Sequence, residues 1–257
     1  MNHVTWVFAR KMLALLSTLT VVGIAAAQDS AELPDAASLL DRSVEVTGGR
    51  DAFERLQTFI AKGSVEIVGA GISGTMSVFL EGENYYVAIE FPGVGTTESG
   101  VTNGIAWEHS PMLGARIKTG PEESQAKRDA AMFIGATAAW REWFAQVETV
   151  GRTDIEGEDA YEITMTPLDG APMSMYFGVE SGLALRMDQV SSSQMGDIPM
   201  QVTFSNYAEF GGVLTPMLRA TSFSGQTVRQ ILASVEVNAE VPEGRFDLPA
   251  AVAELIE

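Results

Sequence analysis

Cysteine is absent from the 257-residue sequence, and histidine occurs only twice. Without cysteine the chain forms no disulfides, so its stability has to come from burial and hydrogen bonding. Zinc sites draw mainly on cysteine and histidine ligands, and His109 is the one histidine outside the extreme N-terminal segment. The usual zinc sites are therefore excluded, and we expect neither a metal nor a cofactor.

Positive charge is also scarce. The chain has 16 Lys and Arg against 34 Asp and Glu, which gives a net charge of −18. Proteins that bind nucleic acids or anionic lipid surfaces need clusters of basic side chains to neutralise phosphates. This balance excludes a nucleic-acid partner and argues against stable attachment to an anionic membrane surface.

Long apolar runs are limited to one segment near the N-terminus, Met12–Ile24. The run is shorter than the about 20 residues that a membrane-spanning helix needs. It follows Arg10 and Lys11 and precedes the small residues Ala25–Ala27, which is the pattern of a secretory signal peptide. The sequence therefore predicts an export signal rather than a membrane anchor.

We accordingly expect a signal peptide at residues 1–27, cleaved near Ala27, and a mature periplasmic protein at residues 28–257. No cysteine follows the apolar run, which excludes lipid attachment at an N-terminal cysteine. Cleavage removes two basic residues and lowers the net charge to about −20. The mature chain is expected to be a monomer without a stable membrane anchor.

Short β-favouring runs, broken by Gly, Pro and Asn, dominate the mature sequence. They cover residues 62–68, 74–80, 85–91, 96–101, 105–109, 115–119, 148–154, 160–166, 172–179, 183–191, 199–210, 217–224 and 228–241. No strand–helix–strand alternation recurs, and two-residue turns separate many of the runs. The sequence predicts a mainly β protein with a single large, curved antiparallel sheet and a few helices packed against it.

Three helical segments are expected among these strands. Pro34 opens the first, whose apolar stripe is Ala36, Leu39, Leu40, Ser43 and Val44. A short second segment covers residues 51–56. A long third segment covers residues 121–146, where Met132, Phe133, Ala136, Trp140, Trp143 and Phe144 recur at helical spacing.

Two features of the sequence also occur in enzymes, and neither indicates an enzyme here. The G-x-G-x-x-G pattern Gly69–Gly74 precedes a β-favouring run, whereas a dinucleotide site needs a helix directly after it. His109 has no G-x-S-x-G nucleophile motif near it, and the acidic residues are too numerous for any pair to stand out. We therefore predict that the protein is not an enzyme, and a hydrolase using carboxylates or His109 is the least favoured alternative.

Methionine and aromatic side chains are concentrated on the third helical segment and on several strands. Flexible methionine fills irregular space and suits adaptable apolar contacts. Two interpretations are open, a solid core and the lining of an apolar ligand cavity. The residues expected to line such a cavity are Val87, Ile89, Phe91, Trp107, Met132, Phe133, Trp140, Phe144, Met175, Phe177, Met187, Met200 and Phe204.

Four stretches of the sequence, in this order and spacing, resemble a known family. They are Val46-Thr47-Gly48-Gly49-Arg50-Asp51-Ala52, Gly100-Val101-Thr102-Asn103-Gly104-Ile105-Ala106-Trp107-Glu108, Tyr161-Glu162-Ile163-Thr164-Met165-Thr166-Pro167 and the ending Val237–Pro249. The chain resembles the LolA and LolB superfamily of periplasmic lipoprotein carriers, and especially its outer-membrane lipoprotein-sorting proteins. The resemblance implies an unclosed β-barrel of about eleven strands, covered by helices, with an apolar cavity for acyl chains.

This resemblance leads to two hypotheses about function. The first is a soluble periplasmic carrier or sensor that binds a lipid or a lipoprotein acyl chain. The second is a non-enzymatic module with the same fold and a packed interior, which docks a protein partner in the cell envelope. The resemblance places the carrier's cavity arginine on strand 85–91, which contains no arginine, so no ligand-binding residue is carried over from the family.

Overall fold

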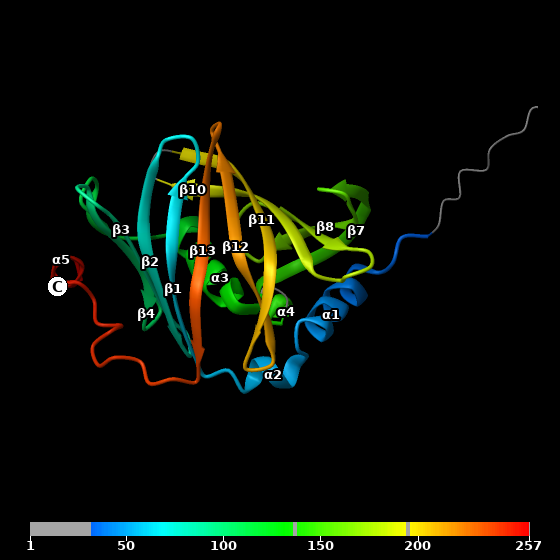
Figure 1. Cartoon of the computed structure of the whole chain (residues 1–257), viewed down its shortest axis with the longest axis horizontal. Helices are drawn as coiled ribbons and strands as arrows, with labels where there is room; N and C mark the ends of the chain where they lie inside the picture. The colour runs from blue at the N-terminus through cyan, green and yellow to red at the C-terminus, as the bar shows by residue number, and fades with distance from the viewer. Residues whose placement is uncertain (1–31, 136–137, 194–195, 257) are drawn as a thin grey trace, which may run out of the picture. The chain divides into compact units, whose positions relative to one another are not determined.

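All the strands of the computed structural model, which describes residues 32–135, 138–193 and 196–256, belong to one antiparallel sheet (Figure 1). The strands are β1 (Thr58–Ile67), β2 (Ile72–Glu81), β3 (Asn84–Phe91), β4 (Gly95–Thr102), β5 (Ile105–Ser110), β6 (Gly114–Ile117), β7 (Phe144–Ile155), β8 (Glu158–Pro167), β9 (Met173–Gly178), β10 (Ala184–Ser193), β11 (Gly196–Phe210), β12 (Val213–Phe223) and β13 (Gln226–Val237). Their order across the sheet is β6-β5-β4-β3-β2-β1-β13-β12-β11-β10-β9-β8-β7. Two meanders, one from each half of the chain, are joined where β1 pairs with β13.

The connection between β6 and β7 shapes the interior of the molecule. These strands are the opposite edges of the sheet, so the segment that joins them has to cross one of its faces. That segment contains α3 (Pro121–Gly135) and α4 (Trp140–Trp143). Helix α3 contacts β4 and β5 on one side and β10 on the other, and since six strands separate β4 from β10 in the sheet, the sheet has to curl around the helix.

Helix α1 (Ala36–Val46) begins at Asp35, whose carboxylate accepts a hydrogen bond of 3.0 Å from the Ser38 backbone N–H. This N-cap satisfies a donor that the first helical turn would otherwise leave free. The helix buries the stripe expected from the sequence, Ala36, Leu39, Leu40, Ser43 and Val44, and contacts β7. The short helix α2 (Arg50–Glu54) follows and leads into β1.

The two faces of the sheet are covered by different parts of the chain. Alternation along β1 places Phe59 and Ala61 in a cluster with Phe133 of α3, and Ile60 in a cluster on the opposite face. The C-terminal segment after β13, with α5 (Ala250–Ala253), covers that opposite face. There Val252 packs with Trp107, and both side chains have no exposed surface.

An open, mainly β fold with a few helices is confirmed, with thirteen strands in the described residues instead of about eleven. The continuous helix predicted over 121–146 is only partly correct, because α3 ends at Gly135, α4 covers Trp140–Trp143, and the chain from Phe144 onward pairs with β8 as the edge strand β7. The last strand ends at Val237, before the predicted residue 241, because Asn238 adopts a left-handed conformation with φ of 54°. The expected signal peptide, residues 1–27, lies outside the described residues, in which no helix is long and apolar enough to cross a membrane.

Candidate ligand-binding cavity

A cavity of about 350 Å³ lies between α3 and the face of the sheet that curls around it. Side chains from β2, β3 and β4 line one side, and side chains from β10, β11 and β12 line the other. Its volume lies within the about 300 to 1,000 Å³ that is typical of small-molecule sites. The cavity is therefore large enough to hold a ligand.

The structure brings seven of the thirteen predicted lining residues together around this cavity. They are Val87, Met132, Phe133, Met175, Met187, Met200 and Phe204. A left-handed residue in β11, Asn206 with φ of 56°, interrupts the strand alternation. As a result Phe204 and Tyr207, three residues apart, both face the cavity.

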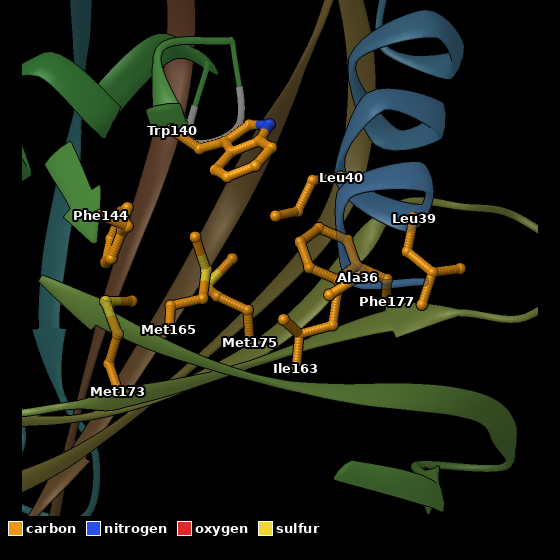
Figure 2. Packing of buried hydrophobic residues seen from close by; sticks show 10 residues of the cluster. All are labelled: Ala36, Leu39, Leu40, Trp140, Phe144, Ile163, Met165, Met173, Met175 and Phe177. Atoms are coloured by element: carbon orange, nitrogen blue, oxygen red, sulfur yellow. The ribbon is translucent and has the colours of Figure 1, made fainter. Parts of the chain in front are cut away.

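The other six predicted residues do not line the cavity. Ile89 and Phe91 pack beside it in the cluster around Phe59. Figure 2 shows Trp140, Phe144 and Phe177 in the cluster that joins α1 and α4 to the sheet. Trp107 is fully buried on the opposite face, and its indole N–H donates a hydrogen bond of 3.1 Å to Thr102.

Methionine makes the wall adaptable where the apolar cluster in Figure 2 meets the cavity. Met165, Met173 and Met175 lie side by side in that cluster, and Met175 also lines the cavity. Thioether side chains have several accessible rotamers and can repack around ligands of different shape. This wall favours an apolar ligand without specifying its shape.

Arg219 of β12 adds a positive charge to this apolar cavity. Its guanidinium donates a hydrogen bond to the backbone carbonyl of Phe133 on α3 and lies 4.0 Å from the centroid of the Phe133 ring. Burial lowers the pKa of Arg219, although the nearby Tyr85 and Tyr207 oppose the shift. In the part of the chain that the structure describes, no carboxylate forms an ion pair with Arg219.

Two tyrosines lie beside this arginine on the cavity wall. Tyr207 of β11 donates a hydrogen bond of 2.6 Å from its hydroxyl to the Ala184 carbonyl. Tyr85 of β3 packs its ring 5.5 Å from that of Phe133. Burial raises the pKa of both hydroxyls, so both remain neutral hydrogen-bonding groups.

Asp129 of α3 also lines the cavity. Part of its surface is exposed, yet nearby protein atoms replace much of the water around the carboxyl group. This desolvation raises the pKa of the carboxyl group to about 6, against the opposing effect of Arg128 and Lys118. Around neutral pH the cavity therefore holds a carboxylate that is more easily protonated than an ordinary aspartate.

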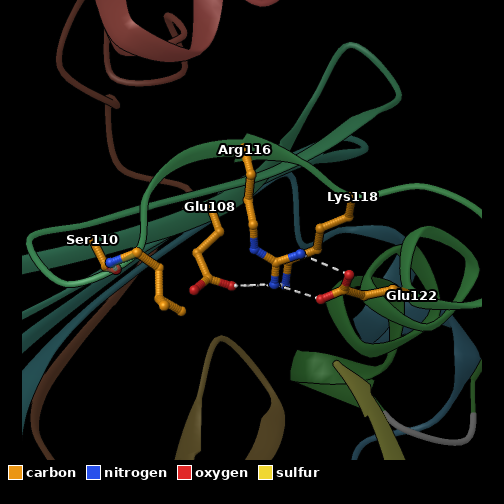
Figure 3. A network of polar contacts seen from close by, with 6 residues as sticks. Glu108, Ser110, Arg116, Lys118 and Glu122 are labelled. Atoms are coloured by element: carbon orange, nitrogen blue, oxygen red, sulfur yellow. Dashed lines mark hydrogen bonds and ion pairs between the residues drawn. The ribbon is translucent and has the colours of Figure 1, made fainter. Parts of the chain in front are cut away.

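An ion-pair network fixes the start of α3 and the position of Lys118. Figure 3 shows Arg116 of β6 between Glu108 of β5 and Glu122 in the first turn of α3, with hydrogen bonds of 3.0 Å to Glu108 and 2.7 Å to Glu122. Lys118 lies 3.6 Å from Glu108. Because Arg116 holds the pKa of Glu122 below its usual value, the network stays charged around neutral pH and ties the helix to the edge strand.

No family model matches the sequence, and no curated protein matches it. Solved structures do match. A DUF1329 family protein from Desulfovibrio piger is 14% identical, with 85% of this chain and 100% of that chain covered and a TM-score of 0.57. A LolA superfamily protein from Nitrosomonas europaea is 15% identical, with 84% of this chain and 99% of that chain covered and a TM-score of 0.55. The chain has the LolA-like fold.

A third structure extends this similarity. It is a domain from Vibrio parahaemolyticus assigned to an outer membrane lipoprotein-sorting protein. The two sequences are 14% identical, 81% of this chain and 97% of that chain are covered, and the TM-score is 0.54. At such identities the likeness shows the fold alone. In this LolA-like fold the curled sheet and the helix within it enclose the cavity described above.

Sequence reasoning missed Arg219 because it sought a cavity arginine only on strand 85–91. In this LolA-like chain the arginine comes from β12, on the other side of the cavity. The one signal in the sequence is a single cation, Arg219, within the otherwise uncharged strand Val213–Phe223. Its position relative to α3 depends on how far the sheet curls, which the sequence of β12 does not specify.

His109 lies outside the cavity, on β5. Its Nδ1 is 3.5 Å from the Glu98 carboxylate, which also accepts a hydrogen bond of 2.5 Å from the Tyr86 hydroxyl. No serine or threonine hydroxyl in the described residues donates a hydrogen bond to His109, so a nucleophile–base pair is not formed there. Over the same residues no group of three or more His, Asp or Glu side chains is arranged to hold a metal ion.

A second, more open hollow of about 690 Å³ adjoins the first cavity. Gln189 and Met200 line both, so the two spaces are neighbours along β10 and β11. The second hollow is bordered by the turn between β12 and β13, including Phe223 and Ser224. The cavity under α3 therefore has a larger and more open hollow beside it.

Proposed function

We propose that this protein is an exported, non-enzymatic carrier or sensor that holds a lipid-like ligand, with at least one alkyl chain in the cavity under α3. The observation that carries the proposal is the cavity of about 350 Å³ with methionine and aromatic side chains in its wall. Transfer of apolar surface from water to such a wall contributes roughly 25 cal/mol per Å². An alkyl chain therefore needs few polar contacts to bind.

The LolA-like fold supports this proposal, since one structure of the same fold is assigned to outer membrane lipoprotein sorting. Export through a signal peptide at residues 1–27 would place the carrier in the periplasm, between two membranes. Its low content of basic residues would keep it from adhering to anionic lipid surfaces. These properties suit a protein that moves a ligand through water.

The alternative of an interaction module with a packed interior has less support. A packed interior leaves few voids larger than a water molecule, whereas this interior contains a space of ligand size. The edge strand β7 could in principle pair with a partner strand, but register shifts interrupt its pairing at two places, next to Phe144 and next to Thr149. We therefore favour ligand carriage.

Mass spectrometry of the protein isolated without detergent tests the proposal. We expect the native protein to carry an amphiphile at up to one equivalent, which organic extraction removes. The same spectrum after extraction should show the protein mass alone, and added amphiphile should restore the complex. A protein that emerges empty and does not bind any alkyl-chain compound afterwards would contradict the proposal.

A further inference from the structure

The charge of Arg219 lacks a protein counter-ion. Five of the ten other arginines in the described residues, Arg116, Arg141, Arg152, Arg186 and Arg229, form an ion pair with an Asp or Glu. Arg219 instead lies among aromatic rings and one backbone carbonyl. A partly buried cation without a counter-ion is unfavourable, and it is unexpected in a chain in which acidic residues outnumber basic ones two to one.

Part of the guanidinium has no hydrogen-bond partner in the described residues. One Nη2 hydrogen bond goes to the Phe133 carbonyl, while Nε is buried and has no hydrogen-bond partner in the described residues. The Tyr85 hydroxyl nearby also has no partner among those residues, unlike the hydroxyl of Tyr207. Planar guanidinium groups bind carboxylates and phosphates through two parallel hydrogen bonds, and Tyr85 can add a third donor.

We propose that Arg219 binds the anionic head group of a single-chain amphiphile, a carboxylate or a phosphate, while the alkyl chain occupies the methionine-lined part of the cavity. This inference rests on the proposed function and names its ligand class. The anionic head group of the ligand then acts as the counter-ion of Arg219, which forms no ion pair within the described residues. A volume of about 350 Å³ is at the lower end of ligand-site volumes, which suits one chain better than several.

Asp129 allows a second test of how charge in the cavity affects ligand binding. Asp129 and Arg219 both line the cavity. Both charges act on the Tyr85 hydroxyl, whose pKa Arg219 lowers and Asp129 raises. The Asp129 carboxylate therefore opposes an anionic head group at Arg219. Removing the charge of Asp129 should strengthen anion binding, whereas removing the charge of Arg219 should weaken it.

Three ligands with the same twelve-carbon chain test the proposal on the full-length protein: dodecanoate, dodecyl phosphate and dodecanol. Each displaces a fluorescent apolar probe from protein freed of bound lipid. We expect the two anions to bind at least tenfold more tightly than dodecanol. The tighter of the two anions identifies the natural head group as carboxylate or phosphate.

Variants at the two charged positions separate recognition from folding. Arg219→Gln should bring the anion-to-alcohol ratio close to one while dodecanol affinity changes less than threefold, and Arg219→Lys should retain part of the preference. Asp129→Asn should raise the affinity for both anions and leave dodecanol unchanged. If Arg219 only held α3 in place, Arg219→Gln would weaken all three ligands equally, which would overturn the proposal.

The outcomes also separate this proposal from the proposed function. Equal binding of dodecanol and the two anions by the native protein overturns the anion site and leaves carriage of an apolar ligand standing. Failure of all three compounds to bind overturns both. An unchanged anion preference in Arg219→Gln shows that another cation, such as Lys118, holds the head group and overturns the assignment to Arg219.

Discussion

Arg219 on β12 and Phe133 on α3 are joined in two ways, by a hydrogen bond from the guanidinium to the Phe133 carbonyl and by stacking at 4.0 Å from the ring centroid. The contact connects the sheet to the end of the helix that covers the cavity. Both residues also line the cavity. The same side chain therefore contacts α3 and adds a positive charge to the cavity wall.

Replacement of this arginine by an apolar residue should not destabilise the empty protein. The hydrogen bond and the ring contact together are worth about 2 to 4 kcal/mol, but a buried charge without a counter-ion costs several kcal/mol. We expect Arg219→Met to unfold in urea with a free energy equal to that of the native protein or up to about 2 kcal/mol higher.

Arg186 on β10 provides the control for that measurement. It already pairs with Asp188 at a partly exposed site, so Arg186→Met should change the free energy of unfolding by less than about 1 kcal/mol. A loss of more than about 2 kcal/mol in Arg219→Met would mean that anchoring of α3 outweighs the burial of charge.

Asp129 predicts a specific pH dependence of stability. Its pKa in the folded protein is raised from 3.8 to about 6, so folding disfavours the ionised form, and the penalty is present above pH 6 and fades as the pH falls towards 4. Because the side chain faces an open cavity, water reduces the penalty to about 1 kcal/mol or less.

Asp129→Asn should therefore be more stable than the native protein at pH 7.5, and the difference should shrink towards pH 4. Urea unfolding at pH 7.5, 6 and 4.5 measures it, with Asp197→Asn as a control at an exposed aspartate. A difference that stays constant over this range would contradict the assignment of the shift to Asp129.

Substitution of two leucines, one buried and one exposed, distinguishes the effect of core packing on stability from that of a surface change. Leu40 on α1 has no exposed surface and packs against Trp140 and Phe177 in the cluster of Figure 2, whereas Leu33 is 39% exposed. We expect Leu40→Ala to lower the free energy of unfolding by about 3 kcal/mol, within the range for buried leucines. Leu33→Ala should lower it by less than about 1 kcal/mol, and similar losses for both variants would contradict the packing of α1.

Two glycines with positive φ differ in the space around them. A Cβ at Gly48, where φ is +132°, would lie 2.2 Å from the Gly212 carbonyl oxygen, whereas a Cβ at Gly69, where φ is +80°, meets no atom within 4 Å. Gly69→Ala should cost about 1 to 2 kcal/mol from backbone strain alone. Gly48→Ala should cost at least about 2 kcal/mol more, and equal melting temperatures for the two variants would be inconsistent with this close approach.

Local patterns in the sequence predict much of the fold because they depend on local physics. The stripe on α1 matches the residues that the helix buries, and the alternation of Tyr85, Val87, Ile89 and Phe91 matches one cluster on one face of β3. The helix predicted to continue through Phe144 fails for a non-local reason. Phe144 pairs with Pro167 of β8, and this tertiary pairing outweighs a helical spacing that the aromatic residues satisfy equally well.

The cavity was harder to predict than the fold. Periodicity distinguishes inward from outward residues, and it does not distinguish a residue at a void from one in a packed cluster. Met175 and Phe177 share a face of β9, yet only Met175 reaches the cavity. The position of Arg219 in the cavity could not be predicted for the same reason, since it depends on how the sheet curls around α3.

The most direct test of ligand carriage is to fill the cavity. Ala184 lines it, whereas Ala145 is exposed on the edge strand β7, so Ala184→Phe and Ala145→Phe add the same side chain inside and outside. Titration of both lipid-free variants and the native protein with a fluorescent apolar probe measures the free sites. We predict one site per molecule in the native protein and in Ala145→Phe, and at least tenfold weaker binding in Ala184→Phe with its melting temperature preserved within a few degrees; undiminished binding by a folded Ala184→Phe would contradict the account.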